Sequence, residues 1–168
     1  MADGGGFPEP VIAARSLVRH FPVTRGVLFR RTVATVRAVD GIDFSVLPGS
    51  SFTIVGESGC GKTTTARMIL RLDRPSAGEI AFEGRPVEGG SPEAERLYRR
   101  GIQAVFQDPY SSLDPRQKVE AIIAEPLRAL GISGPRRPAI EAALRDVGLP
   151  TDAISRYPHE FSGGQRQR

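Results

Sequence analysis

The chain has 168 residues and a formal net charge of +4, with 39% hydrophobic and 25% charged residues. This composition is ordinary for a soluble globular protein, and the length allows one domain or part of one. No apolar run approaches the about 18 residues that a membrane-spanning helix needs. Cys60 is the single cysteine, which excludes an internal disulfide.

The net charge and the first residues indicate whether the protein binds nucleic acid and whether it is secreted. A basic balance is one feature of nucleic-acid-binding proteins, but the arginines are scattered and few aromatic residues stand between them. We therefore expect no nucleic-acid partner. Residues 1–6 are polar and glycine-rich and do not have the pattern of a signal peptide, so a cytoplasmic protein is expected.

The first part of the chain predicts strands over residues 11–14, 17–22, 32–39 and 42–46. We expect a loop over residues 26–31 and a turn at Asp40-Gly41 between them. Phe21 stands directly before a proline and is a candidate for stacking on an adenine base. From spacing alone, a core or edge aromatic is the more common role.

A glycine-rich loop follows at residues 56–63, with the pattern Gly, four residues, Gly-Lys-Thr. Residues 51–55 before it are apolar and β-branched and predict a buried strand. The sequence after it predicts a helix from about Lys62 to about Leu72. Strand, loop and helix together are the context of a phosphate-binding loop. This context disfavours the alternative, a glycine-rich turn with an exposed lysine.

The chemistry of such a loop follows from its residue types. Glycines let the backbone turn and approach a ligand, so that successive amides form an anion nest beside the positive end of the helix. Lys62 is expected to reach the β- and γ-phosphates, and the Thr63 hydroxyl to bind Mg²⁺. The predicted nucleotide-binding residues here are Gly56, Glu57, Ser58, Gly59, Cys60, Gly61, Lys62, Thr63 and Thr64.

Further elements complete the predicted core. We expect a strand over residues 79–82, a helix from the Ser91-Pro92 cap to Arg100 that stops at Gly101, and a core strand over residues 102–106. A polar loop over residues 107–116 comes directly after that strand. Ligands bind at such strand ends in open α/β sheets, so Gln107 is placed to contact a metal, a water or a phosphate.

The rest of the chain predicts helices. Residues 119–130, interrupted at Pro126, and residues 139–147 both have helical spacing. Near the end, Ser162 can cap a helix that starts in Gly163 and Gly164, which makes a second anion site. Alone, Ser-Gly-Gly-Gln is usually a loop. For His20 and His159 we expect surface or structural roles.

The phosphate loop, Gln107 after a core strand, and residues 161–165 with the sequence Phe-Ser-Gly-Gly-Gln together resemble the nucleotide-binding subunits of ABC transporters. The resemblance covers nearly the whole chain. Residues 20–38 and 106–116 look like the dipeptide/oligopeptide permease branch, although nickel and glutathione importers share these features. Asp114 stands where that branch usually has Asn, and Phe161 where most ABC proteins have Leu.

The resemblance implies an α/β fold: the core of a P-loop NTPase of the ABC type, with an N-terminal antiparallel β subdomain and a truncated helical subdomain. The expected parts are a flexible N-terminus at residues 1–10, an incomplete ATP-binding core with the β subdomain at residues 11–107, and a helical subdomain at residues 108–168 that ends in the signature motif.

The resemblance also implies roles, with ATP and Mg²⁺ as cofactors. Phe21 would stack on adenine, Lys62 would hold phosphates for catalysis, and Gln107 would complete the shell of Mg²⁺ and water. The residues Ser162, Gly163, Gly164 and Gln165 would close over a nucleotide held by a second ATP-binding subunit. The implied partners are that subunit, transmembrane permease subunits at the inner face of the membrane and, indirectly, a solute-binding protein.

The family places its second Mg²⁺-binding strand, its catalytic Glu and its switch histidine after the position of Arg168. We therefore expect the chain to bind MgATP, to hydrolyse it negligibly alone and to be marginally stable. The leading interpretation is the ATP-binding part of an importer of peptides or a related solute. The alternatives are a non-catalytic nucleotide-binding fragment without a transport role, and a soluble ABC-type ATPase of DNA repair or translation.

Overall fold

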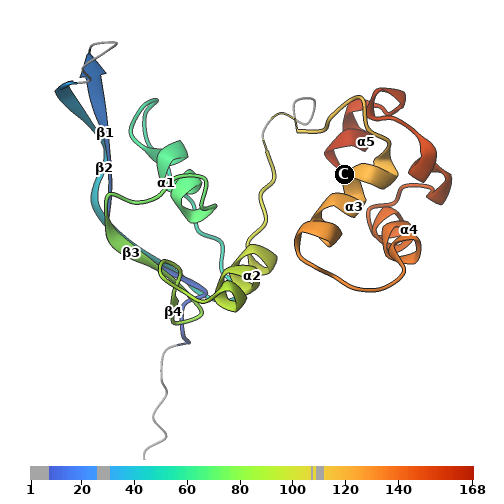
Figure 1. Cartoon of the computed structure of the whole chain (residues 1–168), viewed down its shortest axis with the longest axis horizontal. Helices are drawn as coiled ribbons and strands as arrows, with labels where there is room; N and C mark the ends of the chain where they lie inside the picture. Colours follow the sequence, from blue (N-terminus) through green and yellow to red (C-terminus); the bar gives the residue numbers. More distant parts are fainter. Residues whose placement is uncertain (1–7, 26–30, 107, 109–111) are drawn as a thin grey trace, which may run out of the picture. The chain divides into compact units, whose positions relative to one another are not determined.

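The structure is a computed structural model that describes residues 8–25, 31–106, 108 and 112–168 (Figure 1). The chain forms two compact units, Met1–Gln103 and Ala104–Arg168. No helix in the described part is both long enough and apolar enough to cross a membrane. Residues 26–30 of the loop predicted over residues 26–31 and the predicted site residue Gln107 lie outside the described residues, and Arg31 begins a strand.

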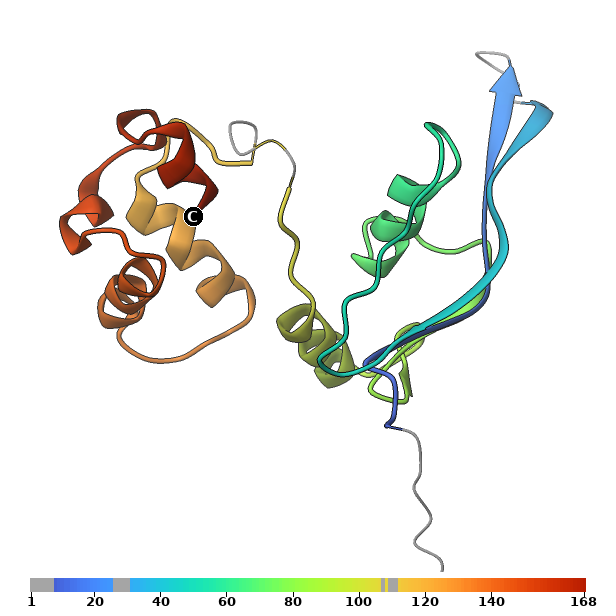
Figure 2. The same cartoon turned by 180° about the vertical axis from the view of Figure 1, so that it is seen from behind.

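The first unit contains a four-stranded antiparallel sheet in the order β2-β1-β3-β4. The strands are β1 (Ile12–Arg25), β2 (Arg31–Val46), β3 (Ala77–Phe82) and β4 (Arg85–Pro86). Two helices, α1 (Lys62–Ile69) and α2 (Pro92–Gly101), lie on the concave side of the curved sheet (Figures 1 and 2). The sheet and these helices enclose the core of the unit.

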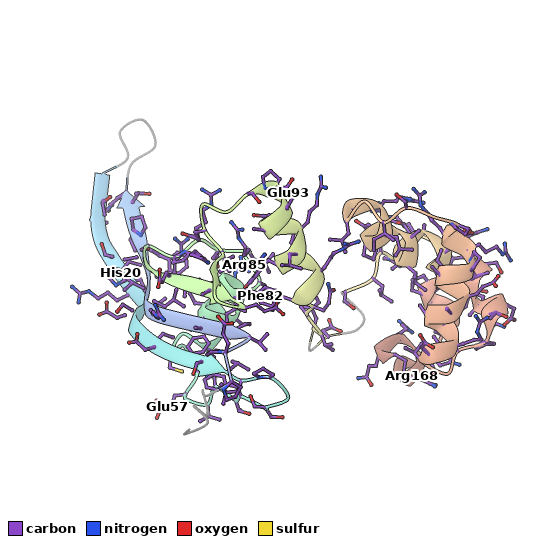
Figure 3. All side chains as sticks on the ribbon, turned by 90° about the horizontal axis from the view of Figure 1, so that it is seen from below. His20, Glu57, Phe82, Arg85, Glu93 and Arg168 are labelled. Carbon is purple, nitrogen blue, oxygen red and sulfur yellow. The ribbon has the colours of Figure 1, made fainter. Side chains whose placement is uncertain are left out.

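This core consists of apolar side chains from the sheet, both helices and the segment after β4: Ile12, Ala14, Leu17, Val39, Met68, Ile80, Phe82, Val87 and Tyr98. Phe82, labelled in Figure 3, lies beside α2, and its ring meets that of Tyr98 edge to face at 5.3 Å. Tyr98 also donates a hydrogen bond to the carbonyl of Ile69. Arg71 donates to the Val87 carbonyl at 3.1 Å and pairs with Glu95. These contacts join the end of α1 to α2.

The turn predicted at Asp40-Gly41 is wrong, because β2 continues through it. In the register of β1 and β2, Leu17 faces Ile42 and Val18 faces Asp40, so Gly41 has no partner. Its φ of +75° is the left-handed conformation of a glycine in a β-bulge. The glycine therefore bends a long strand and does not end it.

A second bulge lies three residues earlier in β2. Arg19 faces Val39 and His20 faces Arg37, which leaves Ala38 without a partner on β1. A bulge redirects the backbone of the strand in which it lies. At this position the redirected Ala38 carbonyl contacts the loop before α1.

The strands predicted over residues 51–55 and 102–106 do not form among the described residues. Val55 is 83% exposed and Val105 is 96% exposed, so the prediction of buried strands is wrong here. Their composition favours strands, but a strand also needs a neighbour that accepts and donates its backbone hydrogen bonds. The described part of the chain places no strand beside either segment, although the Phe52 ring stacks on Phe44 at 5.2 Å.

Local signals predicted two helices of the first unit well. Ser91 caps α2 by accepting a hydrogen bond from the Ala94 amide at 3.3 Å, and the helix ends at Gly101, as the sequence indicated. Helix α1 starts at Lys62, as predicted, but ends at Ile69 and not near Leu72. Arg71 has a φ of +54°, which is incompatible with a continuing right-handed helix.

The second unit is helical, with α3 (Val119–Ala129), α4 (Arg136–Asp146), two short 3₁₀ helices, η1 (Thr151–Ser155) and η2 (Pro158–Glu160), and α5 (Gly163–Gln167). Helix α3 runs through Pro126, where an interruption was predicted. The core of this unit is formed by Ala124, Ile140, Leu144, Ala153, Ile154 and Phe161.

Candidate functional site

The loop before α1 is shaped by three glycines with positive φ: +156° at Gly56, +85° at Gly59 and +95° at Gly61. Residues other than glycine rarely adopt such backbone conformations. A side chain at Gly61 would also collide with the Ala38 carbonyl of β2. Within the loop, the Cys60 amide donates to the Glu57 carbonyl at 3.3 Å. The result is a tight turn that rests against the bulged part of β2.

The ammonium group of Lys62 lies inside this turn. Its Nζ donates hydrogen bonds to the carbonyl of Gly56 at 2.8 Å and to that of Glu57 at 2.6 Å, and it lies 3.5 Å from Cys60 Sγ. Glu57, labelled in Figure 3, has an exposed side chain. The loop thus holds a positive charge close to its own main chain.

The start of α1 adds unsatisfied amides next to that charge. Gly61 is the N-cap and no side chain caps the helix. Thr65 closes the first turn through its amide and its hydroxyl, which donate to the Gly61 carbonyl at 2.8 and 3.1 Å. The amides of Lys62, Thr63 and Thr64 have no hydrogen-bond partner in the part of the chain that the structure describes. The first turn has no acidic residue, so these amides and the helix dipole favour an anion.

The residues present fit a polyphosphate and a hard cation. Orphan amides and one ammonium group are donors for phosphate oxygens. The exposed Thr63 side chain offers a hydroxyl oxygen, a ligand type that Mg²⁺ accepts together with phosphate oxygens and water. Within the described ranges, no cluster of three or more His, Cys, Asp or Glu side chains is placed to hold a metal ion.

Phe21 lies on β1 opposite Val36 of β2 and is half-buried. The Arg19 guanidinium lies over its ring, with Cζ 4.4 Å from the ring centroid. Val36 is two residues from Ala38, whose carbonyl contacts the phosphate loop at Gly61. The register of the sheet therefore brings the predicted stacking aromatic and the phosphate loop to the same short run of β2.

The same part of β1 and β2 holds a cluster of His20, Arg37 and Asp40 that the sequence did not predict. His20 Nε2 lies 2.9 Å from Asp40 Oδ1, and Arg37 donates to Asp40 Oδ2 at 3.4 Å. The hydrogen bond from His20 is the main cause that holds the pKa of Asp40 below its ordinary value. The Arg37–Asp40 spacing is visible in the sequence, but the His20 partner depends on a register set by two bulges.

The predicted cap in the second unit is confirmed. Ser162 Oγ accepts a hydrogen bond from the Gln165 amide at 3.3 Å, and the Ser162 amide donates to Gln165 Oε1 at 2.9 Å. This reciprocal pair is a capping box. Gly163 and Gly164 are the first residues of α5. The role of these four residues toward a nucleotide stays a prediction.

Comparison with known proteins agrees with this arrangement. The family model described as ABC transporter matches residues 39–168. The di/tripeptide transport ATP-binding protein DppF of Pseudomonas aeruginosa (strain UCBPP-PA14) is 45% identical over 163 residues, which cover 95% of this chain and 50% of that protein. The glutathione import ATP-binding protein GsiA of Escherichia coli (strain K12) is 48% identical over 162 residues, which cover 95% of this chain and 26% of that protein.

Solved structures show the same fold. The cbiO1 protein from Clostridium perfringens, part of the ABC transporter complex cbiONQ, has a TM-score of 0.69 at 23% identity and covers 95% of this chain and 58% of its own. The bacterial ABC transporter cassette MJ0796, solved as a dimer, has a TM-score of 0.71 at 22% identity and covers 92% of this chain and 65% of its own. The chain spans half or less of the length of DppF and GsiA. Its likeness to the solved cassettes shows the α/β fold of an ABC cassette. The chain belongs to the ABC transporter family.

Proposed function

We propose that this chain is part of the ATP-binding subunit of an importer for small peptides or a related solute, and that it binds MgATP. The observation that carries the proposal is the Lys62 ammonium group, held inside a glycine loop beside three orphan amides of α1. The names of the relatives, a di/tripeptide transporter component and a glutathione import protein, support a peptide-like solute.

In this proposal the loop neutralises the charge of the polyphosphate. An ammonium group has three donors, and Lys62 now gives two of them to the Gly56 and Glu57 carbonyls. Phosphate oxygens carry more negative charge than these carbonyls, so they compete for the same donors. The amides of α1 are fixed by the helix and need no rearrangement to meet the anion.

Other residues are proposed to bind the metal ion and the adenine base of the nucleotide. The Thr63 hydroxyl binds Mg²⁺ with the phosphate oxygens, and Gln107 completes the shell of metal and water. The ion, when bound, neutralises charge on the transferred phosphoryl group. The Phe21 ring stacks on the adenine.

The remaining roles concern the assembled transporter. Residues 162–165 are proposed to close over a nucleotide that a second ATP-binding subunit holds. Permease subunits anchor the pair at the inner face of the membrane, and a solute-binding protein delivers the solute. Hydrolysis of ATP is coupled to transport in that assembly. The chain alone is expected to turn ATP over negligibly, because Lys62 and the loop amides neutralise charge but do not activate a water.

Calorimetric titration of the folded chain with MgATP tests the proposal. We expect saturable binding that Lys62→Ala weakens about 10- to 100-fold, since hydrogen bonds to charged groups contribute about 1.5–3 kcal/mol. Lys118→Ala is the matched control, because Lys118 is the other lysine of the chain and lies in the second unit, at the N-cap of α3. The absence of binding by a chain with a native circular-dichroism spectrum would contradict the proposal.

A further inference from the structure

We propose that Arg19 is a positioning residue for the nucleobase: its guanidinium backs one face of the Phe21 ring and leaves the opposite face for the base. This inference rests on the proposed nucleotide binding and adds a residue to it. The contact that carries it is the 4.4 Å separation between Arg19 Cζ and the centroid of the Phe21 ring. That distance is well within the range of a cation–π interaction.

The strand geometry explains why the two side chains meet. Residues at i and i+2 of a strand point to the same face, and Arg19 and Phe21 have this spacing on β1. The nearby bulge lies in the partner strand, at Ala38. The side chains of β1 therefore alternate regularly between these two residues, so Arg19 and Phe21 lie on the same face of the sheet.

The surroundings of Arg19 point to the ring and not to a hydrogen-bonded structural role. Arg19 Nε is buried without a hydrogen-bond partner in the described part of the chain. Burying a donor in this way costs free energy, and a side chain selected for hydrogen bonding would satisfy it. The positive charge instead lies near the Asp73 carboxylate, whose pKa is lowered first by its hydrogen bond with Arg67 and further by the charge of Arg19.

Asp73 adds a negative charge in the neighbourhood of Arg19. It accepts a hydrogen bond from Arg67 Nε of α1 at 2.6 Å, and its side chain is largely buried. The guanidinium of Arg19 thus lies against the Phe21 ring, within electrostatic reach of the Asp73 carboxylate. The contact with the ring restricts the rotation of both Arg19 and Phe21, and a ring that is already oriented loses less entropy when a base stacks on it.

The position of the pair relative to the phosphate loop supports a role in nucleotide binding. Phe21 faces Val36 on β2, and Val36 is two residues, or about 7 Å, from Ala38, which contacts Gly61 of the loop. A ligand whose phosphates lie in the loop therefore has its other end close to this ring. Removal of the guanidinium is expected to weaken ATP binding about 2- to 5-fold, the range of a cation–π contact.

The test compares two ligands, MgATP and magnesium tripolyphosphate, which has the phosphates but no base. Arg19→Gln and Arg19→Met variants of the 168-residue chain are titrated with both ligands by calorimetry. We expect weaker ATP binding and unchanged tripolyphosphate binding. Arg19→Lys, which keeps the cation, should restore part of the ATP affinity. Arg15→Gln is the matched control, since Arg15 lies on the same strand in an exposed ion pair with Glu79.

A double-mutant cycle measures whether Arg19 and Phe21 are coupled in ATP binding, and a purely structural role of Arg19 would not produce this coupling. If Arg19 acts through the ring, Arg19→Gln should have no further effect on ATP binding in a Phe21→Ala chain. An equal loss for both ligands, no change for ATP, or tighter ATP binding would each overturn the inference. Unfolding of both neutral variants would assign Arg19 to stability instead. A wild-type chain that binds neither ligand would overturn the nucleotide site itself, and the role of Arg19 with it.

Discussion

The main-chain carbonyl of Ala38 on β2 occupies the position that a side chain at Gly61 would need. Ala38 is the unpaired residue of a bulge, and Gly61 is the N-cap of α1. The sheet and the phosphate loop are therefore in van der Waals contact through two backbones. This contact fixes where α1 begins relative to β2.

Alanine at Gly61 should be more disruptive than alanine at Gly59. Both glycines have positive φ, +95° and +85°, so both substitutions carry a similar backbone strain. Only Gly61 has main-chain atoms of Ala38 in the way, whereas nothing lies within 4 Å of the position of a Cβ at Gly59. We expect Gly61→Ala to lower the free energy of unfolding in urea by about 1–3 kcal/mol more than Gly59→Ala does. Equal losses would mean that the contact has no energetic weight.

Tyr98 should make the first unit sensitive to alkaline pH. The side chain is buried, at 3% exposure, and burial raises the pKa of Tyr98 to about 12. Below pH about 10 the phenol is neutral in both states and its stabilising effect is complete. Between pH about 10 and 12 the unfolded chain loses the proton while the folded chain keeps it, so the free energy of unfolding should fall by about 2–3 kcal/mol.

The control for this alkaline pH dependence is the Tyr98→Phe variant, whose stability is measured by urea unfolding from pH 8 to pH 12. The variant should lose about 1 kcal/mol at pH 8, because the Ile69 carbonyl loses its donor. Across the alkaline range its stability should then fall less than that of the wild type. Parallel curves for the two proteins would contradict the assignment to Tyr98.

Asp114 should give the second unit a sensitivity to acid. Hydrogen bonds from the Arg116 side chain and then from its amide lower the pKa of Asp114 to about 2, and both donors lie close, at 3.1 and 3.0 Å. A carboxyl with a depressed pKa stabilises the fold above its unfolded value of about 3.8, and this contribution is lost as the pH falls toward about 2. Asp114→Asn should flatten the dependence of the melting temperature on pH between 4 and 2. The same slope in both proteins would argue against this role.

Phe161 should tolerate leucine but not alanine. It is buried in the core of the second unit, with Leu144 and Ile154 among the residues of its cluster. Phe161→Leu keeps an apolar side chain of similar volume and should cost less than about 1.5 kcal/mol. Phe161→Ala leaves a cavity and should cost about 3–5 kcal/mol. Urea unfolding followed by circular dichroism measures both; a large loss with leucine would mean that the aromatic shape itself is required.

Local signals in the sequence predicted the local parts of the structure. The Ser91-Pro92 pair and Gly101 predicted both ends of α2, because capping and termination depend on neighbours in the chain. The start of α1 at Lys62 and the cap at Ser162 followed for the same reason. These elements need no information about distant residues.

Pairing between distant segments was not visible in the same way. Residues 51–55 and 102–106 have strand composition, but their state depends on whether another strand lies beside them. A turn was predicted at Gly41 because a glycine after aspartate favours one. In the structure Gly41 is the extra residue of a β-bulge, because the register of β1 and β2 leaves it unpaired. The pair of His20 with Asp40 depends on that register too, so the sequence alone could not indicate it. The contact of Arg19 with Phe21 depends only on the alternation within β1.

The contacts of Arg71 and Tyr98 have a mechanical consequence. They clamp the last turn of α1 to α2 through the Val87 carbonyl, Glu95 and the Ile69 carbonyl. Because these contacts hold the end of α1 against α2, a change in the position of α1 is expected to move α2 with it. The orientation of α2 is therefore tied to the helix that begins at the nucleotide loop.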